Sequence, residues 1–263
     1  MKQQILHHLP KDHPWQDRIY WFATTDSTNT QAKLLALQGA PHGTILIADH
    51  QTGGRGRMGR SFQSPAGCGI YLSVLLRPQC SPEELMHLTC ATAVAACNAV
   101  EKAVGIRPGI KWTNDLVCGQ RKIAGILTEL LTVGDQVCAV VGIGINCCQQ
   151  ETDFPEEIRS FAGSLAMVTG QKIERAELIA ELITSLHQMD RELLTNKMTV
   201  MAQYCSDCMT VGRDISLLRA DTVRRGHALS VDDDGALVVR FEDGSIEAVQ
   251  SGEVSVRGMY GYL

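Results

Sequence analysis

The segment R-K-I-A-G-I-L-T-E-L-L-T-V-G-D-Q-V-C-A-V-V-G-I-G-I-N, residues 121–146, decides the fold class. Residues 122–131 and 137–145 are two runs rich in aliphatic side chains, and Gly134-Asp135 between them predicts a turn. A shorter run, residues 116–118, precedes them and is joined to them by a second turn at Gly119-Gln120. Three strands connected by short turns predict an antiparallel β-meander.

Further strands and helices are predicted on both sides of this meander. Residues 18–24, 44–48, 69–76 and 106–112 have the composition of strands. Residues 31–38 carry a helical pattern, and S-P-E-E at residues 81–84 begins a helix that is predicted to run to about residue 104. Residues 155–207 are predicted to be mainly helical. The chain is therefore predicted to be an α+β protein with a mixed, largely antiparallel sheet flanked by helices.

The sequence pattern changes after residue 208. Five short strands are predicted at residues 215–218, 228–231, 236–241, 246–249 and 254–257, and polar turns such as D-D-D-G and E-D-G-S separate them. Short strands joined by tight turns predict a small β-barrel. We therefore divide the chain into a first domain, residues 1–208, and a second domain, residues 209–263.

Composition limits the possible functions. The chain has 263 residues, a net charge of −5 and a pI near 5.9. This acidity disfavours a dedicated nucleic-acid-binding protein, which needs a basic face for phosphates. The N-terminal residues lack the apolar core of a signal peptide, and no apolar run reaches the roughly 20 residues needed to cross a bilayer. We expect a cytoplasmic protein with neither nucleic-acid nor membrane partners.

The ten cysteines predict buried, reduced thiols rather than disulfides. Cys90 and Cys97 lie one heptad apart in an alanine-rich helical run, and Cys138 lies in an apolar strand, where cysteine behaves as a small hydrophobic residue. Cys205 and Cys208 have C-x-x-C spacing, but no second pair or nearby histidine accompanies them, so a zinc site is not favoured.

The loop H-Q-T-G-G-R-G-R-M-G-R, residues 50–60, concentrates glycine and arginine. It lacks the G-K-[ST] ending of a Walker A loop and the spacing of a dinucleotide-binding motif. What it offers is free backbone N–H groups and the guanidinium groups of Arg55 and Arg57, which recognise phosphate or carboxylate through paired hydrogen bonds. An ordinary flexible surface loop is the alternative, but its place directly after a buried strand favours an active-site loop.

Lys111 and Lys122 lie in strand-like, apolar surroundings. A lysine there is costly unless an anion pairs with it, so both lysines are candidate ligand-binding residues. The alternative is that they are edge lysines that protect an exposed strand. Asn114-Asp115, which follows Lys111, has the composition of a turn and carries no functional signal by itself.

Gly142 and Gly144 alternate with aliphatic residues in the predicted strand at residues 137–145. Glycines at such positions let another group approach the backbone closely. Alone this is a weak signal.

Taken together, the motifs resemble the catalytic core of biotin–protein ligases. The matching pieces are D-S-T-N (26–29), Q-x-x-G-R-G-R-x-G (51–59), K-W-x-N-D (111–115), R-K-x-A-G-I-L-x-E (121–129), G-I-G-I-N (142–146) and S-G-E-V-S-V-R (251–257). Their order and spacing fit over residues 20–257. The resemblance implies a class II synthetase-like catalytic core, residues 1–208, and an SH3-like C-terminal barrel, residues 209–263.

The resemblance also implies a reaction and partners. Family members activate biotin with MgATP to biotinyl-5′-AMP and pass biotin to one lysine of a biotin carboxyl carrier domain on a biotin-dependent carboxylase. Mg²⁺ is expected to arrive on the phosphates of ATP, without a metal site made by the protein. Members of the family often form homodimers, so the resemblance also points to a homodimer. Asp26, in the first motif, lies too near the N-terminus for a preceding helix-turn-helix domain, so we expect the form without DNA-binding function.

Residue roles follow from the matched motifs. The resemblance implies Lys122, Arg57 and Asp115 as catalytic residues. The implied biotin-binding residues are Ser27, Thr28, Asn29, Gln51, Arg55, Gly56, Arg57, Lys122, Gly125, Gly142 and Gly144. The implied ATP-binding residues are Arg55, Arg57, Lys111, Asn114, Lys122, Asn146 and Arg257. The family often has tryptophan just after the glycine–arginine loop, where this chain has Phe62, so adenine stacking is expected to differ.

Two further function classes compete with this assignment. A lipoate or octanoate ligase or transferase shares the fold, but it needs a long apolar channel and lacks the G-R-G-R and K-W-x-N-D motifs. A non-catalytic biotin sensor does not need the phosphate-directed charge of Arg55, Arg57 and Lys122. Pyrophosphate exchange driven by biotin or by lipoate discriminates between these classes.

Overall fold

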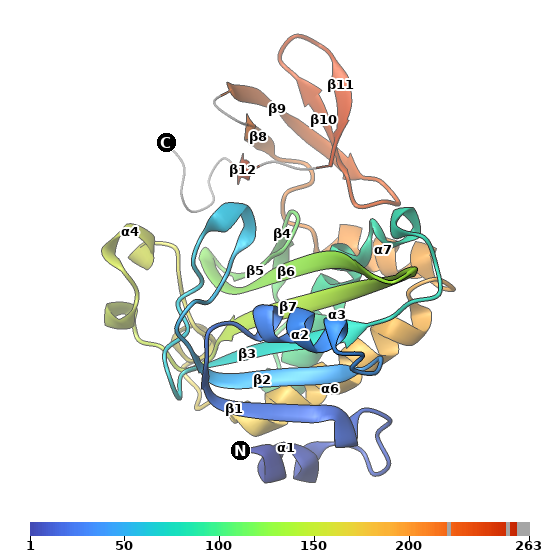
Figure 1. Cartoon of the computed structure of the whole chain (residues 1–263). Coiled ribbons are helices and arrows are strands. Elements are labelled where there is room, and N and C mark those ends of the chain that lie inside the picture. The colour runs from blue at the N-terminus through green and yellow to red at the C-terminus, as the bar shows by residue number, and fades with distance from the viewer. Residues whose placement is uncertain (220–221, 251–252, 257–263) are drawn as a thin grey trace.

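The computed structural model describes residues 1–219, 222–250 and 253–256 (Figure 1). A seven-stranded sheet forms its centre, with the strand order β1-β2-β3-β7-β6-β5-β4. Strands β1 and β2 pair in parallel, and the other neighbouring strands pair antiparallel. The strands are β1 Ile19–Thr25, β2 Thr44–Gln51, β3 Gly69–Leu76, β4 Gly109–Lys111, β5 Asp115–Cys118, β6 Arg121–Val133 and β7 Gln136–Asn146. The predicted α+β class with a mixed, largely antiparallel sheet is confirmed.

The meander that dominates the sequence forms the middle of the sheet. Strands β6 and β7 pair from Ala124 opposite Ile145 to Val133 opposite Gln136. The turn between them contains Gly134 at φ +61°, a left-handed conformation that glycine adopts without steric cost. The shorter turn at Gly119, φ +60°, joins β5 to β6 in the same way.

Helices cover both faces of the sheet (Figure 1). Alternate residues of a strand point to opposite faces, so Ile45 and Ile47 of β2 pack in the larger core with α3 and α6, whereas Leu46 packs in the smaller core under α2. The helices are α1 Lys2–His8, α2 Thr28–Leu37, α3 Leu88–Val104, α4 Glu156–Arg159, α5 Leu165–Thr169, α6 Arg175–Glu192 and α7 Lys197–Asp207. No helix in the described part of the chain is long and apolar enough to span a membrane.

Several predicted element boundaries were wrong. The strand predicted at residues 106–112 is shorter, Gly109–Lys111, and the one predicted at residues 228–231 begins earlier, at Thr222. The helix predicted from residue 81 is split into a 3₁₀ turn, Pro82–Leu85, with a capping box at Ser81, and the helix α3, which begins at Leu88. Helix α2 begins at Thr28 rather than residue 31, and β2 extends to Gln51 rather than residue 48. The last two differences matter because they place the D-S-T-N and Q-x-x-G-R-G-R motifs at the ends of rigid elements.

The cysteine prediction is confirmed in part. All ten thiols are free, and five are buried, Cys90, Cys97, Cys138, Cys147 and Cys208, whereas the other five are only partly buried. Burial raises the pKa of the Cys90 thiol to about 12, so this thiol stays protonated and packs as an apolar group. Cys205, at the end of α7, is only partly buried.

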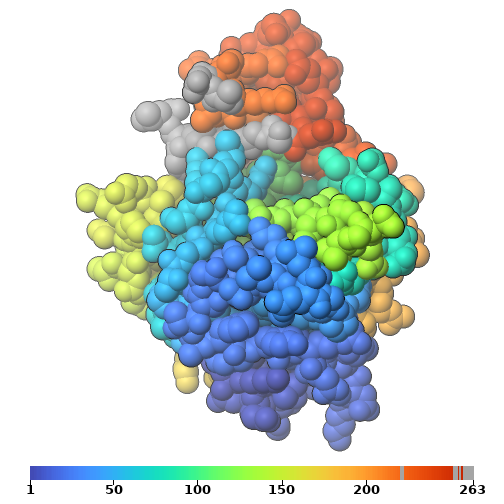
Figure 2. Space-filling view, viewed as in Figure 1, coloured from blue at the N-terminus to red at the C-terminus, as the bar shows by residue number. Residues whose placement is uncertain are grey.

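A second, five-stranded antiparallel sheet follows, with the order β11-β10-β9-β8-β12. Its strands are β8 Asp214–Arg219, β9 Thr222–Val231, β10 Leu237–Phe241, β11 Ile246–Val249 and β12 Glu253–Val256. It lies at one end of the molecule, above β4 and β5 (Figures 1 and 2). Closure of this sheet into an SH3-like barrel, and the domain division at residues 208 and 209, stay predictions.

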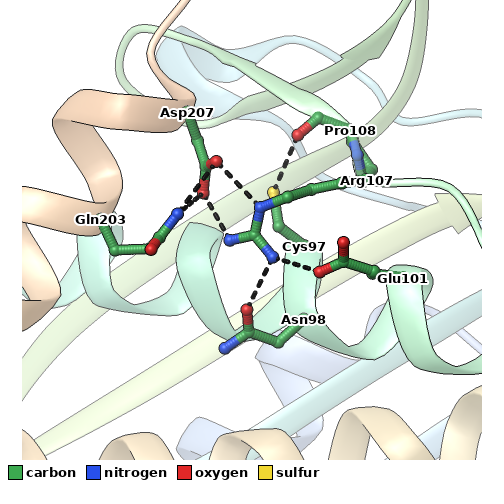
Figure 3. Close-up of polar contacts among 7 residues, drawn as sticks. All are labelled: Cys97, Asn98, Glu101, Arg107, Pro108, Gln203 and Asp207. Atoms are coloured by element: carbon green, nitrogen blue, oxygen red, sulfur yellow. Dashed lines mark hydrogen bonds and ion pairs between the residues drawn. The ribbon is translucent and has the colours of Figure 1, made fainter.

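Polar contacts anchor the chain where it enters the second sheet. The guanidinium group of Arg107 donates to both carboxylate oxygens of Asp207, at 2.9 and 2.6 Å, and also to Asn98 and Glu101 of α3 (Figure 3). The indole N–H of Trp112 donates to the carbonyl oxygen of Gly235, in the turn before β10, at 2.9 Å. The end of α7 is thus held beside a residue that precedes β4, and the second sheet beside the residue that follows β4.

Candidate active site

One cavity of about 460 Å³ brings the predicted site residues together. It is lined by the first turn of α2, the loop after β2, strands β5, β6 and β7, the segment around α4, and Val254 of β12. In Figure 2 the light-blue loop after β2 lies on the surface, below the second sheet and beside the segment around α4. The predicted residues that line the cavity are Ser27, Thr28, Asn29, Gln51, Arg55, Gly56, Arg57, Lys111, Asn114, Asp115, Lys122, Gly125, Gly142, Gly144 and Asn146. Arg257 lies outside the described residues.

One end of the cavity is a buried network of neutral polar groups. The backbone N–H and hydroxyl of Thr28 both donate to Gln51 Oε1, at 2.8 and 3.2 Å. The amide of Gln51 donates to Ser64 Oγ at 2.9 Å. On the other side Ser73 Oγ lies 2.7 Å from Thr28 Oγ1 and 2.6 Å from Asn29 Oδ1. We call this the neutral end; its groups are held before any ligand arrives.

Asn29 is fixed most completely. Its side-chain Nδ2 donates to the carbonyl oxygen of Leu127 at 3.1 Å and to Glu129 Oε2 at 2.9 Å, while its Oδ1 accepts from Ser73. Because both amide hydrogens are used and an amide oxygen has two lone pairs, Asn29 can still accept one hydrogen bond from a ligand. The residue is 4% exposed, so an unpaired lone pair here favours a ligand donor.

Of the four predicted glycines, the three on β6 and β7 play different parts. A Cβ at Gly142 would collide with Oδ1 of Asn29 and lie 2.8 Å from its Cγ, so Gly142 is required for the position of Asn29. A Cβ at Gly144 would lie 2.5 Å from the ring of Phe62. At Gly125 it would make ordinary contacts, 3.5 Å from Lys122 Cε and 3.6 Å from Phe62. The Phe62 ring thus covers the backbone of β6 and β7 at Gly125 and Gly144, where no side chain stands between the ring and the strands.

The other end of the cavity carries the positive charge, and we call it the cationic end. Lys122 Nζ lies 2.7 Å from Asp115 Oδ1, and Lys111 is buried at 6% exposure. Arg57 donates to Asn114 Oδ1 at 2.8 Å. The Nδ2 of Asn114 in turn donates to the carbonyl oxygen of Ile126 and to Asp115 Oδ1, both at 3.1 Å. Arginine and lysine at one wall make a site for a multiply charged anion.

The glycine–arginine loop forms an irregular hairpin. Gly56 N–H donates to the carbonyl oxygen of Arg60 at 2.7 Å, and Phe62 N–H donates to that of Gly54 at 2.9 Å. At its tip Met58 has φ +56° and is 69% exposed. The Arg55 side chain is 48% exposed and lies 3.5 Å from Glu129 Oε1. Backbone bonds therefore shape the loop, while Arg55 reaches from it to Glu129 of β6 and Arg57 to Asn114.

Asn146 differs from the other predicted ATP-binding residues. Its Nδ2 donates to the carbonyl oxygen of Gly163 at 3.0 Å, and its Oδ1 accepts from Gln149 at 3.1 Å. It thus fastens the end of β7 to the segment that carries Phe161 and Ala162, which also line the cavity. A direct contact with ATP stays a prediction.

The sequence of the chain was compared with protein families and with known proteins. Residues 21–146 match the model of the biotin/lipoate A/B protein ligase family, and residues 210–257 match that of the biotin protein ligase C-terminal domain. The bifunctional ligase/repressor BirA of Bacillus spizizenii is 37% identical over 232 residues, 88% of this chain and 71% of the relative. The biotin–[acetyl-CoA-carboxylase] ligase of Paracoccus denitrificans is 30% identical over 90% of this chain and 99% of its own. The chain belongs to the biotin protein ligase family.

A solved structure agrees with this assignment. The biotin protein ligase of Aquifex aeolicus, in complex with biotin and ATP, superimposes with a TM-score of 0.78 at 30% identity, covering 91% of this chain and 98% of that one. The resemblance drawn from the sequence motifs and the ligase class are confirmed.

Sequence reasoning missed two residues of this ligase's site. Ser73 links Thr28 to Asn29 from inside the fully buried strand β3. A lone serine within the apolar run I-Y-L-S-V-L-L was the available signal, because a buried hydroxyl needs partners. Glu129 belonged to a quoted motif but received no role, since its reach to α2 and to the loop depends on the tertiary fold.

Proposed function

We propose that this ligase activates biotin with ATP to biotinyl-5′-AMP and transfers biotin to a lysine of a carrier protein. The observation that carries the proposal is a single cavity with a neutral end, built for hydrogen-bond donors and acceptors, and a cationic end, built for phosphates. Biotin has one group of each kind: a ureido ring and a carboxylate. The bound adenylate would span both ends.

The neutral end suits the ureido ring. This group offers one carbonyl acceptor and two N–H donors, and a buried site with matched partners rejects analogues that lack them. Asn29 has one acceptor position left for a ring N–H. Ser27 and Thr28 bring hydroxyl groups from the beginning of α2, and both are buried. Gly144 lets the Phe62 ring lie directly against β7, and this ring forms an apolar wall of the cavity.

The cationic end suits the reaction of two anions. In the first step an oxygen of the biotin carboxylate attacks the α-phosphorus of ATP, and the bond to pyrophosphate breaks. Repulsion between the anions is reduced by positive side chains fixed where they meet. Arg55, Arg57, Lys111 and Lys122 supply this charge, and the hydrogen bond from Arg57 to Asn114 holds one guanidinium in place. Mg²⁺, bound through the phosphates of ATP, would neutralise charge on the leaving pyrophosphate.

Lys122 and Asp115 are proposed to act in sequence. In the free protein they form an ion pair of 2.7 Å. When the carboxylate and α-phosphate arrive, Lys122 exchanges Asp115 for these anions. Asp115 is then available to orient the ammonium group of the acceptor lysine and to take its proton. The neutral amine attacks the acyl carbon, AMP leaves, and an amide bond forms.

The partners follow from the family. A biotin carrier protein is the acceptor, and we propose that it is the biotin carboxyl carrier domain of a biotin-dependent carboxylase. Homodimerisation and a cytoplasmic location stay predictions.

Pyrophosphate exchange tests the proposal. The purified protein is incubated with ATP, Mg²⁺ and either biotin or lipoate, and exchange of labelled pyrophosphate into ATP is followed. We expect exchange with biotin and mass detection of biotinyl-5′-AMP on the protein. Exchange with lipoate alone would replace the proposal by a lipoate ligase, and biotin binding without exchange would indicate a sensor.

A further inference from the structure

Glu129 lies where three separate parts of the site meet. Its Oε2 accepts from Nδ2 of Asn29, at the beginning of α2, at 2.9 Å. Its Oε1 lies 2.9 Å from Nζ of Lys33, one turn further along α2, and 3.5 Å from Nη1 of Arg55 in the glycine–arginine loop. One side chain of β6 therefore contacts both the residue that fixes the neutral end and the loop that carries the phosphate-binding arginines.

The charge of Glu129 is maintained by its surroundings. Burial alone would raise its pKa, but hydrogen bonds from Lys33 and Asn29 and the positive charges of Lys33 and Arg55 outweigh burial and lower the pKa below its ordinary value. The side chain is 22% exposed. A partly buried carboxylate with two cations beside it holds them more firmly than a fully solvated one.

The two oxygens of Glu129 divide between the two ends of the site. Oε2 orients the amide of Asn29, and thereby keeps the free lone pair of its Oδ1 towards the ligand. Oε1 is shared by Lys33 and Arg55, of which Lys33 is the nearer. A ligand hydrogen bond to Asn29 polarises the amide and strengthens its bond to Glu129. The carboxylate is then fixed as a docking point for Arg55.

We propose that Glu129 is a positioning residue that couples occupancy of the neutral end, sensed at Asn29, to docking of the glycine–arginine loop through Arg55. Loss of the Glu129 carboxylate therefore uncouples the loop from biotin that binds without ATP. The inference rests on the proposed function, because it takes biotin as the ligand of the neutral end.

Hydrogen–deuterium exchange of residues 53–61, with and without biotin and in the absence of ATP, measures the coupling. In the native protein biotin slows exchange of the loop. In Glu129→Gln, which removes the charge but keeps the shape, biotin no longer does so. Glu177→Gln, a matched change at an exposed glutamate of α6, leaves the response as in the native protein. A biotin response of the loop in Glu129→Gln equal to the native one overturns the proposal.

Lys33→Gln separates coupling from a merely structural role. It removes the cation that competes with Arg55 for Oε1. With biotin bound, exchange of the loop is therefore slower in Lys33→Gln than in the native protein, whereas it is faster in Glu129→Gln. If both variants speed exchange, the cluster only stabilises the fold and the proposal fails. This comparison also holds if Glu129→Gln is partly destabilised, because Lys33→Gln keeps the carboxylate.

Kinetics give an independent measurement. Since Lys122 and Arg57 are untouched, Glu129→Gln is expected to raise the KM for biotin about tenfold with kcat within about twofold of the native value. An equal loss in kcat with an unchanged KM would overturn the role. Absence of any biotin-dependent pyrophosphate exchange in the native protein would instead overturn the proposed function, so the two failures are distinguishable.

Discussion

Two asparagines, Asn29 and Asn114, are held in nearly the same way at opposite ends of one cavity. The Nδ2 of each donates to a main-chain carbonyl of β6, at Leu127 and Ile126 respectively, and to a carboxylate. They differ in what their Oδ1 receives. Asn29 Oδ1 accepts from a neutral hydroxyl and keeps room for a ligand, whereas Asn114 Oδ1 accepts from the guanidinium of Arg57.

The difference shows how one strand serves two kinds of recognition. We propose that at the neutral end Asn29 itself supplies an atom that contacts the ligand. At the cationic end Asn114 holds Arg57, and we propose that the Asp115 carboxylate gives up Lys122 to the anions of the ligand. We therefore expect changes at the neutral end to act on biotin binding and changes at the cationic end to act on the chemical step.

The largest effect is expected at Lys122. Lys122→Met removes the charge beside the reacting carboxylate and phosphate, so adenylate formation should fall by about 10²–10³-fold, the usual loss for one electrostatic group at a reacting centre. Biotin binding without ATP should weaken much less than adenylate formation, because the ureido ring is proposed to bind at the neutral end. Single-turnover formation of biotinyl-5′-AMP measures the rate of adenylate formation, and calorimetry measures biotin binding. The exposed Lys172, changed to Met, is the control. Full activity of Lys122→Met would remove its proposed role.

Gly142→Ala should act on the other end. The new Cβ collides with Asn29, so we expect biotin affinity to fall by about 30-fold, or about 2 kcal/mol, in the range for overpacking a buried site. Gly125→Ala adds the same methyl group where contacts are ordinary and should cost much less. Titration of biotin against both variants checks this. Equal losses would show that Asn29 is not the point of contact.

Asn114→Ala should produce a smaller effect at the cationic end. It leaves Arg57 charged but removes its orienting acceptor, so kcat for adenylation should fall by about tenfold, about the worth of one hydrogen bond to a charged group. Steady-state pyrophosphate exchange measures kcat, and biotin affinity should stay near the native value. A loss confined to biotin affinity would contradict the expectation that the cationic end acts on the chemical step and the neutral end on biotin binding.

The smallest effect is expected from pH. Two carboxylates lie beside the neutral end, Glu129 and Asp26, and the pKa of each is lowered below its ordinary value, so the contribution of each is present above that value and is lost only as pH falls through the lowered one. Biotin affinity without ATP should therefore be flat from about pH 8 to about pH 5.5. A titration step near neutral pH would contradict this.

Stability must be followed over the same range, because the buried histidines His13 and His87, whose pKa values burial lowers, are expected to respond. Burial, and to a lesser extent the nearby His187, lowers the pKa of His13 below 6.5. The unfolded chain therefore takes up a proton first, and the folded state loses stability as pH falls below that value. Thermal unfolding at each pH separates this loss from any change in biotin affinity.

Much of the fold was predictable because its signals are local. The meander of β5, β6 and β7 has apolar runs interrupted by glycine turns, and the structure forms these hairpins. The pairing of β1 with β2 in parallel, and of β3 with β7 across a long separation, has no local signal. The break before α3 was also missed, since the sequence from Ser81 onward continues with good helix-forming residues.

The sequence by itself determined the chemistry of this protein: which arginines, lysines and amides it has, their order along the chain, and the ligase family that this order indicates. Only the tertiary structure decided the partners of each group. The hydrogen bonds of Ser73, the two ends of Glu129 and the pairing of Lys122 with Asp115 join residues brought together by sheet register and by the seating of α2. Hydrogen bonds and ion pairs depend on ångström-scale distances, and packing across the sheet sets those distances where sequence spacing cannot.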